Sequence, residues 1–152
     1  MLPQSKSVFL ADDDVDDCFL FEDALREIPI LTELTIAHDG EELMQILTHA
    51  AENLPGALFL DLNMPLKNGF ECLTEIRQSE KFALLDVIIL STSFDHDIAY
   101  KLFKTGAKHC ILKPSDFNML KAVIHKVLTA VDENLLILNS ETEKFKNFVL
   151  LR

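Results

Sequence analysis

Aspartates follow short apolar stretches of this sequence, at points where strands of a sheet would end. Asp12, Asp13 and Asp14 follow the first stretch, and Asp61 follows the third. Carboxylate oxygens without histidine or cysteine are the ligands that Mg²⁺ prefers, and Mn²⁺ can replace it. A carboxylate held beside such a cation can attack a phosphoryl group and form an acyl phosphate. The pattern therefore predicts a magnesium site with Asp61 as a nucleophile.

A hydroxyl and an amine follow two later apolar stretches. Ser91 and Thr92 come after the fourth stretch, and Lys113 comes after the fifth, followed by Pro114. Phosphoryl transfer needs in-line positioning and neutralisation of the phosphoryl oxygens. The cation would take one oxygen, the Lys113 ammonium a second and the Ser91 hydroxyl a third.

Each of these residues also has an ordinary interpretation when it is taken alone. The three consecutive aspartates could cap a helix, and Asp61 could begin an Asx-turn. Ser91 could be a strand-end hydroxyl without function, and Lys113 a solvated surface lysine. Ligands of open α/β sheets bind outside the carboxyl ends of the strands. The coincidence of these side chains at successive strand ends therefore favours one shared site.

The elements that would position these residues alternate regularly along the chain. Five apolar runs, typical of buried parallel strands, span residues 7–11, 34–37, 57–60, 87–90 and 110–112. Stretches with helical spacing span residues 16–27, 41–52, 70–80, 95–105 and 116–131. Strict alternation of this kind predicts an α/β fold with a doubly wound, five-stranded parallel sheet. We expect the core aromatic residues to include Phe19, Phe21, Phe59 and Phe103.

Composition narrows the class of protein. A chain of 152 residues with a net charge of −11 is about one domain, and its acidity argues against nucleic-acid binding. No apolar run approaches the length of a membrane helix, and the three cysteines have neither disulfide nor zinc spacing. These features predict a cytoplasmic protein that does not associate with membranes.

Taken together, the motifs resemble the receiver domains of two-component response regulators. The matching stretches are VFLADDD, ALFLDLNMPLKNGFE, VIILSTS and GAKHCILKP, and the resemblance covers about residues 6–131. It implies the flavodoxin-like strand order 2-1-3-4-5. It also implies that Asp61 is the phosphoacceptor, and that a histidine kinase or a phosphotransfer histidine is the donor. Such a domain is a signalling protein that catalyses only its own phosphorylation and dephosphorylation.

The resemblance also assigns roles to neighbouring residues. It implies that Asp13 binds the metal directly, Asp12 mostly through water, and Asn63 through its backbone carbonyl, next to Asp61 itself. Lys113 would contact the phosphoryl group together with Ser91 and Thr92. The peptide bond between Lys113 and Pro114 would be cis. Asn63 and Ser93 would occupy positions that tune hydrolysis.

Two positions depart from the family pattern. Cys110 stands at the switch position, where the family usually has Tyr or Phe, so the switch would depend on movement of Ser91 and repacking of the fourth helix. Thr92 stands where Ala or Gly is common, and would narrow the approach to Asp61. We therefore expect slower phosphorylation by small donors or slower hydrolysis.

The residues beyond the receiver motifs suggest how a signal leaves the domain. Residues 1–131 would form the receiver and residues 132–152 an extension docked on it, so the receiver would stand alone. Another protein would then read the phosphorylated state, or the phosphoryl group would pass onward in a phosphorelay. The chain would be a monomer or a weak homodimer. Lysines that could contact a downstream partner are Lys101, Lys104, Lys108, Lys121 and Lys126; a merely solvated face is the alternative.

Two other functions use similar residues. A pseudo-receiver would bind partners without phosphorylation, but it normally lacks the acid, hydroxyl or lysine, and all are present here. A phosphatase of the haloacid-dehalogenase type would place its nucleophile on the first strand, where Asp12, Asp13, Asp14 and Val15 only mimic the required motif.

Overall fold

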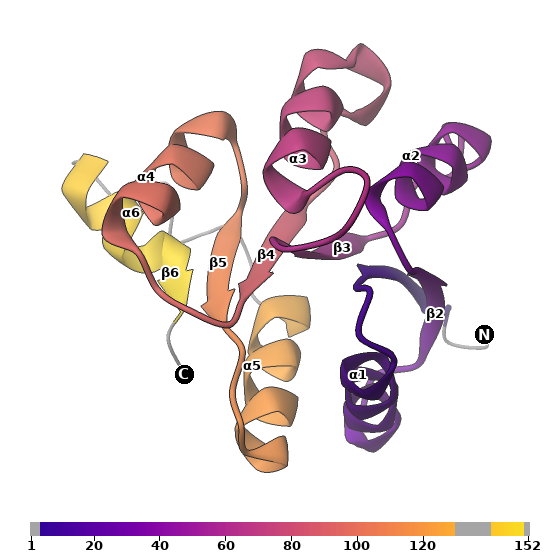
Figure 1. The fold of residues 1–152 in the computed structure, drawn as a ribbon. Helices are drawn as coiled ribbons and strands as arrows, with labels where there is room; N and C mark the ends of the chain where they lie inside the picture. The colour runs from indigo at the N-terminus through magenta and orange to yellow at the C-terminus, as the bar shows by residue number, and fades with distance from the viewer. Residues whose placement is uncertain (1–3, 130–140, 151–152) are drawn as a thin grey trace.

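The computed structural model describes residues 4–129 and 141–150, and it shows a parallel sheet with helices on both faces (Figure 1). The strands are β1 Lys6–Ala11, β2 Thr32–Ala37, β3 Ala57–Asp61, β4 Val87–Ser91, β5 His109–Leu112 and β6 Val149–Leu150. The helices are α1 Val15–Glu27, α2 Gly40–His49, α3 Gly69–Gln78, α4 His96–Thr105, α5 Phe117–Thr129 and α6 Glu141–Phe148, and a short 3₁₀ helix spans Glu80–Phe82.

The strand order is β2-β1-β3-β4-β5-β6, with every neighbouring pair parallel. This confirms the predicted order 2-1-3-4-5 and the flavodoxin-like fold. The structure differs in one respect, because the two-residue strand β6 extends the sheet beyond β5. Its pairing depends on backbone groups, which the apolar pattern of the sequence does not reveal.

Two apolar layers hold the helices against the sheet. Helices α1 and α5 cover one face, while α2, α3 and α4 cover the other (Figure 1). All five residues of β3 and of β4 are buried, whereas β2, at the edge, alternates in exposure. The central strands are therefore clamped on both faces, and their carboxyl ends cannot shift without disturbing the core.

The predicted strands and helices all occur, with ends displaced by a few residues. One expected core residue was wrong: Phe19 lies on α1 but is 61% exposed, while Phe21 and Phe59 are buried and pack edge to face. The face of α1 that meets the sheet carries Cys18, Phe21, Ala24 and Leu25. Phe19 therefore points away from the core because of its phase on the helix.

The C-terminal helix and strand lie against α4 and β5 (Figure 1). Phe148 is only 3% exposed and belongs to the core cluster on the α2–α4 face. The Phe145 ring meets the rings of Tyr100 and Phe103, with centroids 5.4 and 5.5 Å apart. Residues 141–150 are therefore packed on the part of the domain formed by α4 and β5.

Among the described helices, none combines the length and the apolar character that crossing a membrane requires.

Candidate functional site

The register of the sheet brings the ends of β1 and β3 together. Ala11 pairs with Leu60, so the residues that follow them, Asp12 and Asp61, lie side by side. Both are buried, while Asp13 is exposed at the rim. One carboxylate oxygen from each of the three lies within 4.8 Å of the others. Three acidic oxygens at this spacing repel one another, and a hard divalent cation would relieve the repulsion.

Asp14 has a different role from its two neighbours. Its side chain accepts a hydrogen bond from the Asp17 backbone N–H and caps the N-terminus of α1. Asp12 accepts a hydrogen bond from the Asp14 N–H at 2.9 Å. The capping interpretation therefore applies to Asp14, while Asp12 and Asp13 direct carboxylate oxygens into the cluster with Asp61.

Lys113 reaches the cluster from the end of β5. Ser91 pairs with Leu112, so Lys113 follows at the same edge of the sheet, and its N–H donates to the Ser91 carbonyl at 2.7 Å. Its Nζ lies 2.9 Å from Asp12 Oδ2 and 3.5 Å from Asp61 Oδ1. The Lys113 side chain is 15% exposed, so this residue is a partly buried cation within the site and not a solvated surface lysine.

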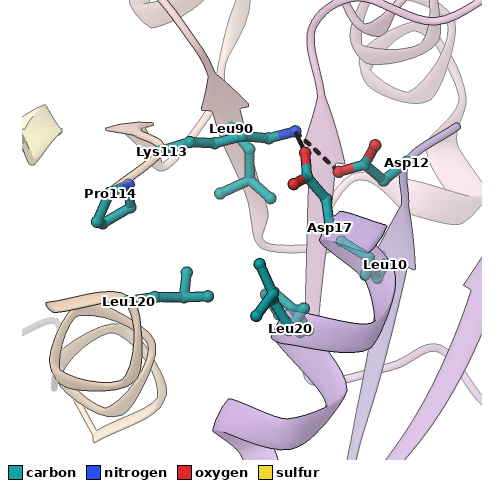
Figure 2. A pocket seen from close by; sticks show the side chains of 9 residues that line it. Leu10, Asp12, Asp17, Leu20, Leu90, Lys113, Pro114 and Leu120 are labelled. Carbon is teal, nitrogen blue, oxygen red and sulfur yellow. Dashed lines mark hydrogen bonds and ion pairs between the residues drawn. The ribbon is translucent and has the colours of Figure 1, made fainter. Parts of the chain in front are cut away.

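Lys113 has a further acidic partner on α1. Its Nζ donates to Asp17 Oδ2 at 2.9 Å, and Figure 2 shows Asp12 and Asp17 meeting the ammonium from neighbouring elements. The lysine lines a cavity whose other lining side chains are mainly apolar, among them Leu20 and Leu120. Asp17 was not among the residues predicted from the sequence to belong to the site. Its place in the first turn of α1, directly after the acidic end of β1, was the available signal.

Burial dominates the electrostatics of Asp61. The pKa of this carboxyl is raised to about 6, mainly by loss of solvation and also by the negative charges of Asp12 and Asp13. The Lys113 charge and a hydrogen bond from the Asn63 backbone lower it. Burial also lowers the pKa of Lys113, but its hydrogen bonds to Asp12 and Asp17 more than offset this, so the net shift is upward. The ammonium therefore stays protonated and keeps Asp61 partly ionised.

A glycine permits the close approach of α3 to the phosphoacceptor candidate. A Cβ atom at Gly69 would lie 2.5 Å from the Asp61 carbonyl oxygen and 2.8 Å from the Leu62 Cα. The Gly69 N–H donates to the Leu62 carbonyl at 2.9 Å. Asn68 and Glu71 form a reciprocal capping box at the start of α3. This turn holds the loop that carries Asn63 against the end of β3.

The Ser91 hydroxyl is buried and forms its hydrogen bonds with the backbone of a nearby residue. It donates to the Ser93 carbonyl at 2.6 Å and accepts from the Ser93 N–H at 3.3 Å. Thr92 is exposed beside it. On the side of α4, a small cavity of about 30 Å³ is lined by Ser91, Leu102 and Cys110, among others. The hydroxyl is therefore held by the Ser93 backbone in this structure.

The peptide bond between Lys113 and Pro114 corrects one expectation. No described peptide bond is cis, so this bond is trans. Trans is the intrinsically preferred isomer of a bond before proline. With that isomer the Lys113 side chain already reaches Asp12 and Asp17.

Comparison with known proteins decides the family. The model of the response regulator receiver domain matches residues 8–125. The chain belongs to this family. Receiver domains are signalling domains that take phosphoryl groups from histidine kinases, bind a divalent metal in an acidic pocket and interact with downstream proteins.

Individual receivers support the assignment. A probable chemotaxis protein CheY from Rhizobium etli is 30% identical over 124 residues, covering 82% of this chain and 93% of that protein. Response regulator Rcp1 from Synechocystis is 34% identical over 96 residues, which are 60% of this chain and 65% of that protein.

Solved receiver structures have the same fold. The crystal structure of the Mn²⁺-bound form of response regulator Rcp1 matches with a TM-score of 0.75 and 28% identity, covering 83% of this chain and 96% of that one. The phosphorylated cyanobacterial phytochrome response regulator RcpA matches with the same TM-score and 27% identity, covering 90% and 98%. The carboxylate cluster of this receiver has the ligand chemistry that such a metal needs.

Proposed function

We propose that this chain accepts one phosphoryl group on Asp61 and signals through contacts that depend on phosphorylation, or passes the group onward in a phosphorelay. The supporting observation is the meeting of three carboxylates and one partly buried ammonium at the ends of three strands. The donor would be a histidine kinase or a phosphotransfer histidine. Residues 141–150 would stay packed on the receiver, against α4 and β5.

The transfer is a substitution at phosphorus. An Asp61 carboxylate oxygen forms the new P–O bond while the P–N bond of the donor phosphohistidine breaks, and its electron pair stays on the imidazole nitrogen. A divalent cation, Mg²⁺ or Mn²⁺, held by Asp12, Asp13, Asp61 and the Asn63 backbone carbonyl, would supply positive charge to the phosphoryl oxygens.

The remaining oxygens of the phosphoryl group are matched by side chains already at the site. Lys113, 3.5 Å from Asp61, would neutralise one oxygen, and the Ser91 hydroxyl would donate to another after leaving Ser93. Thr92 lies beside the approach, and Asn63 and Ser93 border the site where a hydrolytic water would enter. Asn63 and Ser93 are neither strong acids nor strong bases, so we expect no dedicated phosphatase activity.

The phosphorylation test uses acetyl phosphate with Mg²⁺ and intact-protein mass spectrometry. We expect a single phosphoryl adduct that is lost in Asp61→Asn and retained in the matched control Asp97→Asn, which changes an exposed aspartate of α4. Chelation of the metal should abolish the adduct. Absence of any adduct would favour a pseudo-receiver, and catalytic turnover of phosphate esters would favour a phosphatase.

The signal would leave the site through α4 and β5. The cavity beside Ser91 is also lined by Cys110 of β5 and by Leu102 of α4, so a displaced hydroxyl would reach both elements. Cys110 is too small for an aromatic swing. The switch would therefore be movement of Ser91 with repacking of α4, which shifts an equilibrium between two arrangements.

The lysines proposed for partner contacts have different surroundings. Lys101 lies over the Phe70 ring at 4.5 Å, Lys108 pairs with Asp86 and Lys121 pairs with Glu27. Lys104 lies on the exposed side of α4, and Lys126 is exposed on α5. Since Lys101 and Lys104 share a helix, we propose α4 as the element through which a downstream protein is recognised.

Amide NMR spectra with and without beryllofluoride and Mg²⁺ test this route, because beryllofluoride mimics a phosphoryl group. We expect shift changes that continue from the site into residues 96–112. Changes confined to residues 12–14 and 61–63 would contradict a route through α4 and β5. Asp61→Asn, which removes the attachment oxygen, serves as the control without a response.

A further inference from the structure

Asp17 contacts Lys113 without belonging to the carboxylate cluster. Its distance of 2.9 Å to Lys113 Nζ equals that of Asp12 and is shorter than the 3.5 Å to Asp61. The side chain of Asp17 is 36% exposed, against 2% for Asp12 and 7% for Asp61. Asp17 therefore holds the ammonium from the rim of the site, while the other two hold it from within.

The start of α1 fixes the position of Asp17. The Asp14 cap accepts a hydrogen bond from the Asp17 backbone N–H at 3.1 Å, which orders the first helical turn. On the buried side of the same turn, the Cys18 thiol donates to the Asp12 carbonyl at 3.5 Å. The side chain of Asp17 then reaches the Lys113 ammonium, and both residues line the same cavity (Figure 2).

Two cations would compete for the same oxygens at this site. Lys113 pairs with Asp12 and Asp61, and both also belong to the cluster that would bind the divalent cation. An ammonium displaced from them, and repelled by the incoming cation, would tend to leave the site. Asp17 is an acidic partner of Lys113 that lies outside the cluster, so it can retain Lys113 when the other carboxylates are occupied.

We propose that Asp17 is a positioning residue, which holds Lys113 at the mouth of the site so that a divalent cation and the ammonium occupy it together. The inference rests on the proposed function. Without Asp17, Lys113 would pair more strongly with Asp12 and Asp61, and the cation would have to displace it. With Asp17, the ammonium keeps a partner and remains near the phosphoryl oxygen that it neutralises.

Mn²⁺ binding to the full chain, followed by electron paramagnetic resonance of free Mn²⁺, tests the proposal. We expect Asp17→Asn to weaken Mn²⁺ binding by about fivefold, because the competing ammonium is redirected onto the ligands. Asp16→Asn, a change of the same charge in the same helical turn, should weaken it by less than about twofold. Asp17→Glu keeps a carboxylate on this face of α1 and should restore nearly full affinity.

A double-mutant cycle separates positioning from simple loss of charge. In a Lys113→Met background there is no ammonium to retain, so Asp17→Asn should then have no larger effect than Asp16→Asn. Equal effects of Asp17→Asn in both backgrounds would overturn the proposal. So would equal effects of Asp16→Asn and Asp17→Asn in the otherwise unchanged chain, a comparison that does not require the lysine variant to fold.

The same measurements distinguish this inference from the proposed function. If the unchanged chain binds Mn²⁺ and is phosphorylated but Asp17→Asn behaves like Asp16→Asn, only the role of Asp17 fails. If the unchanged chain neither binds Mn²⁺ nor accepts a phosphoryl group, the proposed function itself fails.

Discussion

At the scale of single residues, Asp61 and Lys113 depend on each other. Both side chains are largely removed from water, and each places a charge opposite the other in a region of low polarity. Removing Lys113 would leave the buried Asp61 carboxylate without a cation, whereas Lys113 keeps Asp12 and Asp17 when Asp61 is changed. The pair is also accessible to a small donor at the rim, where Asp13 and Thr92 are exposed. A phosphoryl donor would therefore approach Asp61 past these exposed side chains.

Thr92 gives the first prediction at this scale. We expect Thr92→Ala to raise the rate of phosphorylation by acetyl phosphate, the rate of hydrolysis, or both, by about threefold, because a methyl and a hydroxyl leave the approach to Asp61. Rates can be followed by intact mass over time. Thr48→Ala, an exposed threonine of α2, is the matched control. Unchanged rates in Thr92→Ala would refute its role as a gate.

Residue types and their order were sufficient to predict which residues meet. Asp12, Asp13, Asp61 and Lys113 come together because parallel strands in register end at one edge. Their hydrogen bonds could not be predicted in the same way. The contact between Asp17 and Lys113 depends on a rotamer and on the phase of α1, and the strand pattern defines neither.

At the scale of elements, the C-terminal helix and strand pack where α4 and β5 would otherwise be open. Val149 pairs with Cys110, and Phe148 enters the core cluster that contains Cys110. An aromatic side chain is thus present next to the switch position, although it comes from α6 and not from β5. The predicted extension began at residue 132, and residues 130–140 lie outside the described part of the chain.

Phe148 gives a prediction about this packing. A phenylalanine-to-alanine change in a core lowers stability by about 3–5 kcal/mol. When the residue belongs to a peripheral unit, the destabilisation can appear as local opening of that unit, without global unfolding. We expect Phe148→Ala to speed hydrogen exchange in α6 and at the β5 edge more than it lowers the global free energy of unfolding. Phe19→Ala, which changes an exposed ring on α1, should leave both nearly unchanged.

Exchange rates at β5 that match the unchanged chain would show that Phe148 does not hold β6 in place. If the global free energy of unfolding instead falls by the full amount expected for a core residue, residues 141–150 unfold together with the rest of the domain.

At this scale the sequence predicted the buried strands well, but it did not predict the phase of helix α1 or the strand β6. The apolar runs predict the buried strands, because continuous apolar runs of this length are typical of a parallel sheet. Phe19 was placed in the core because its position next to Phe21 conceals that the two point to different sides of α1. The two residues of β6 are too few to carry any periodic pattern.

At the scale of the whole molecule, the acidic site destabilises the folded state, and binding of a ligand can offset this destabilisation. A chain of net charge −11 brings three carboxylates together and buries two of them. Lys113 offsets part of their repulsion. Binding of a divalent cation to the folded state alone would add stability by mass action.

The pKa of Asp61 predicts a pH dependence of folding. Since its pKa rises from 3.8 to about 6 in the metal-free protein, the folded state holds this proton more tightly than the unfolded chain. The resulting stability is present below about pH 4 and is lost as the pH rises through 6. Asp61→Asn, which is neutral throughout, should therefore be more stable than the unchanged chain at pH 7.5, by on the order of 2 kcal/mol.

Urea unfolding with a chelator at pH 4.5 and 7.5 measures this difference, which should shrink at the lower pH. Added Mg²⁺ at pH 7.5 should stabilise the unchanged chain and not Asp61→Asn, while Asp97→Asn should follow the unchanged chain throughout. An Asp61→Asn protein that is no more stable than the unchanged chain at pH 7.5 without metal would contradict the prediction.

Strand β6 also has a consequence for self-association. Without it, β5 would present an open row of backbone donors and acceptors, onto which a strand of another chain could add. A two-residue strand is too short to serve as a template, so it protects that edge from such addition. In the described part of the sheet, the long open edge is then β2, where Glu33 projects a charge that discourages sheet-to-sheet aggregation.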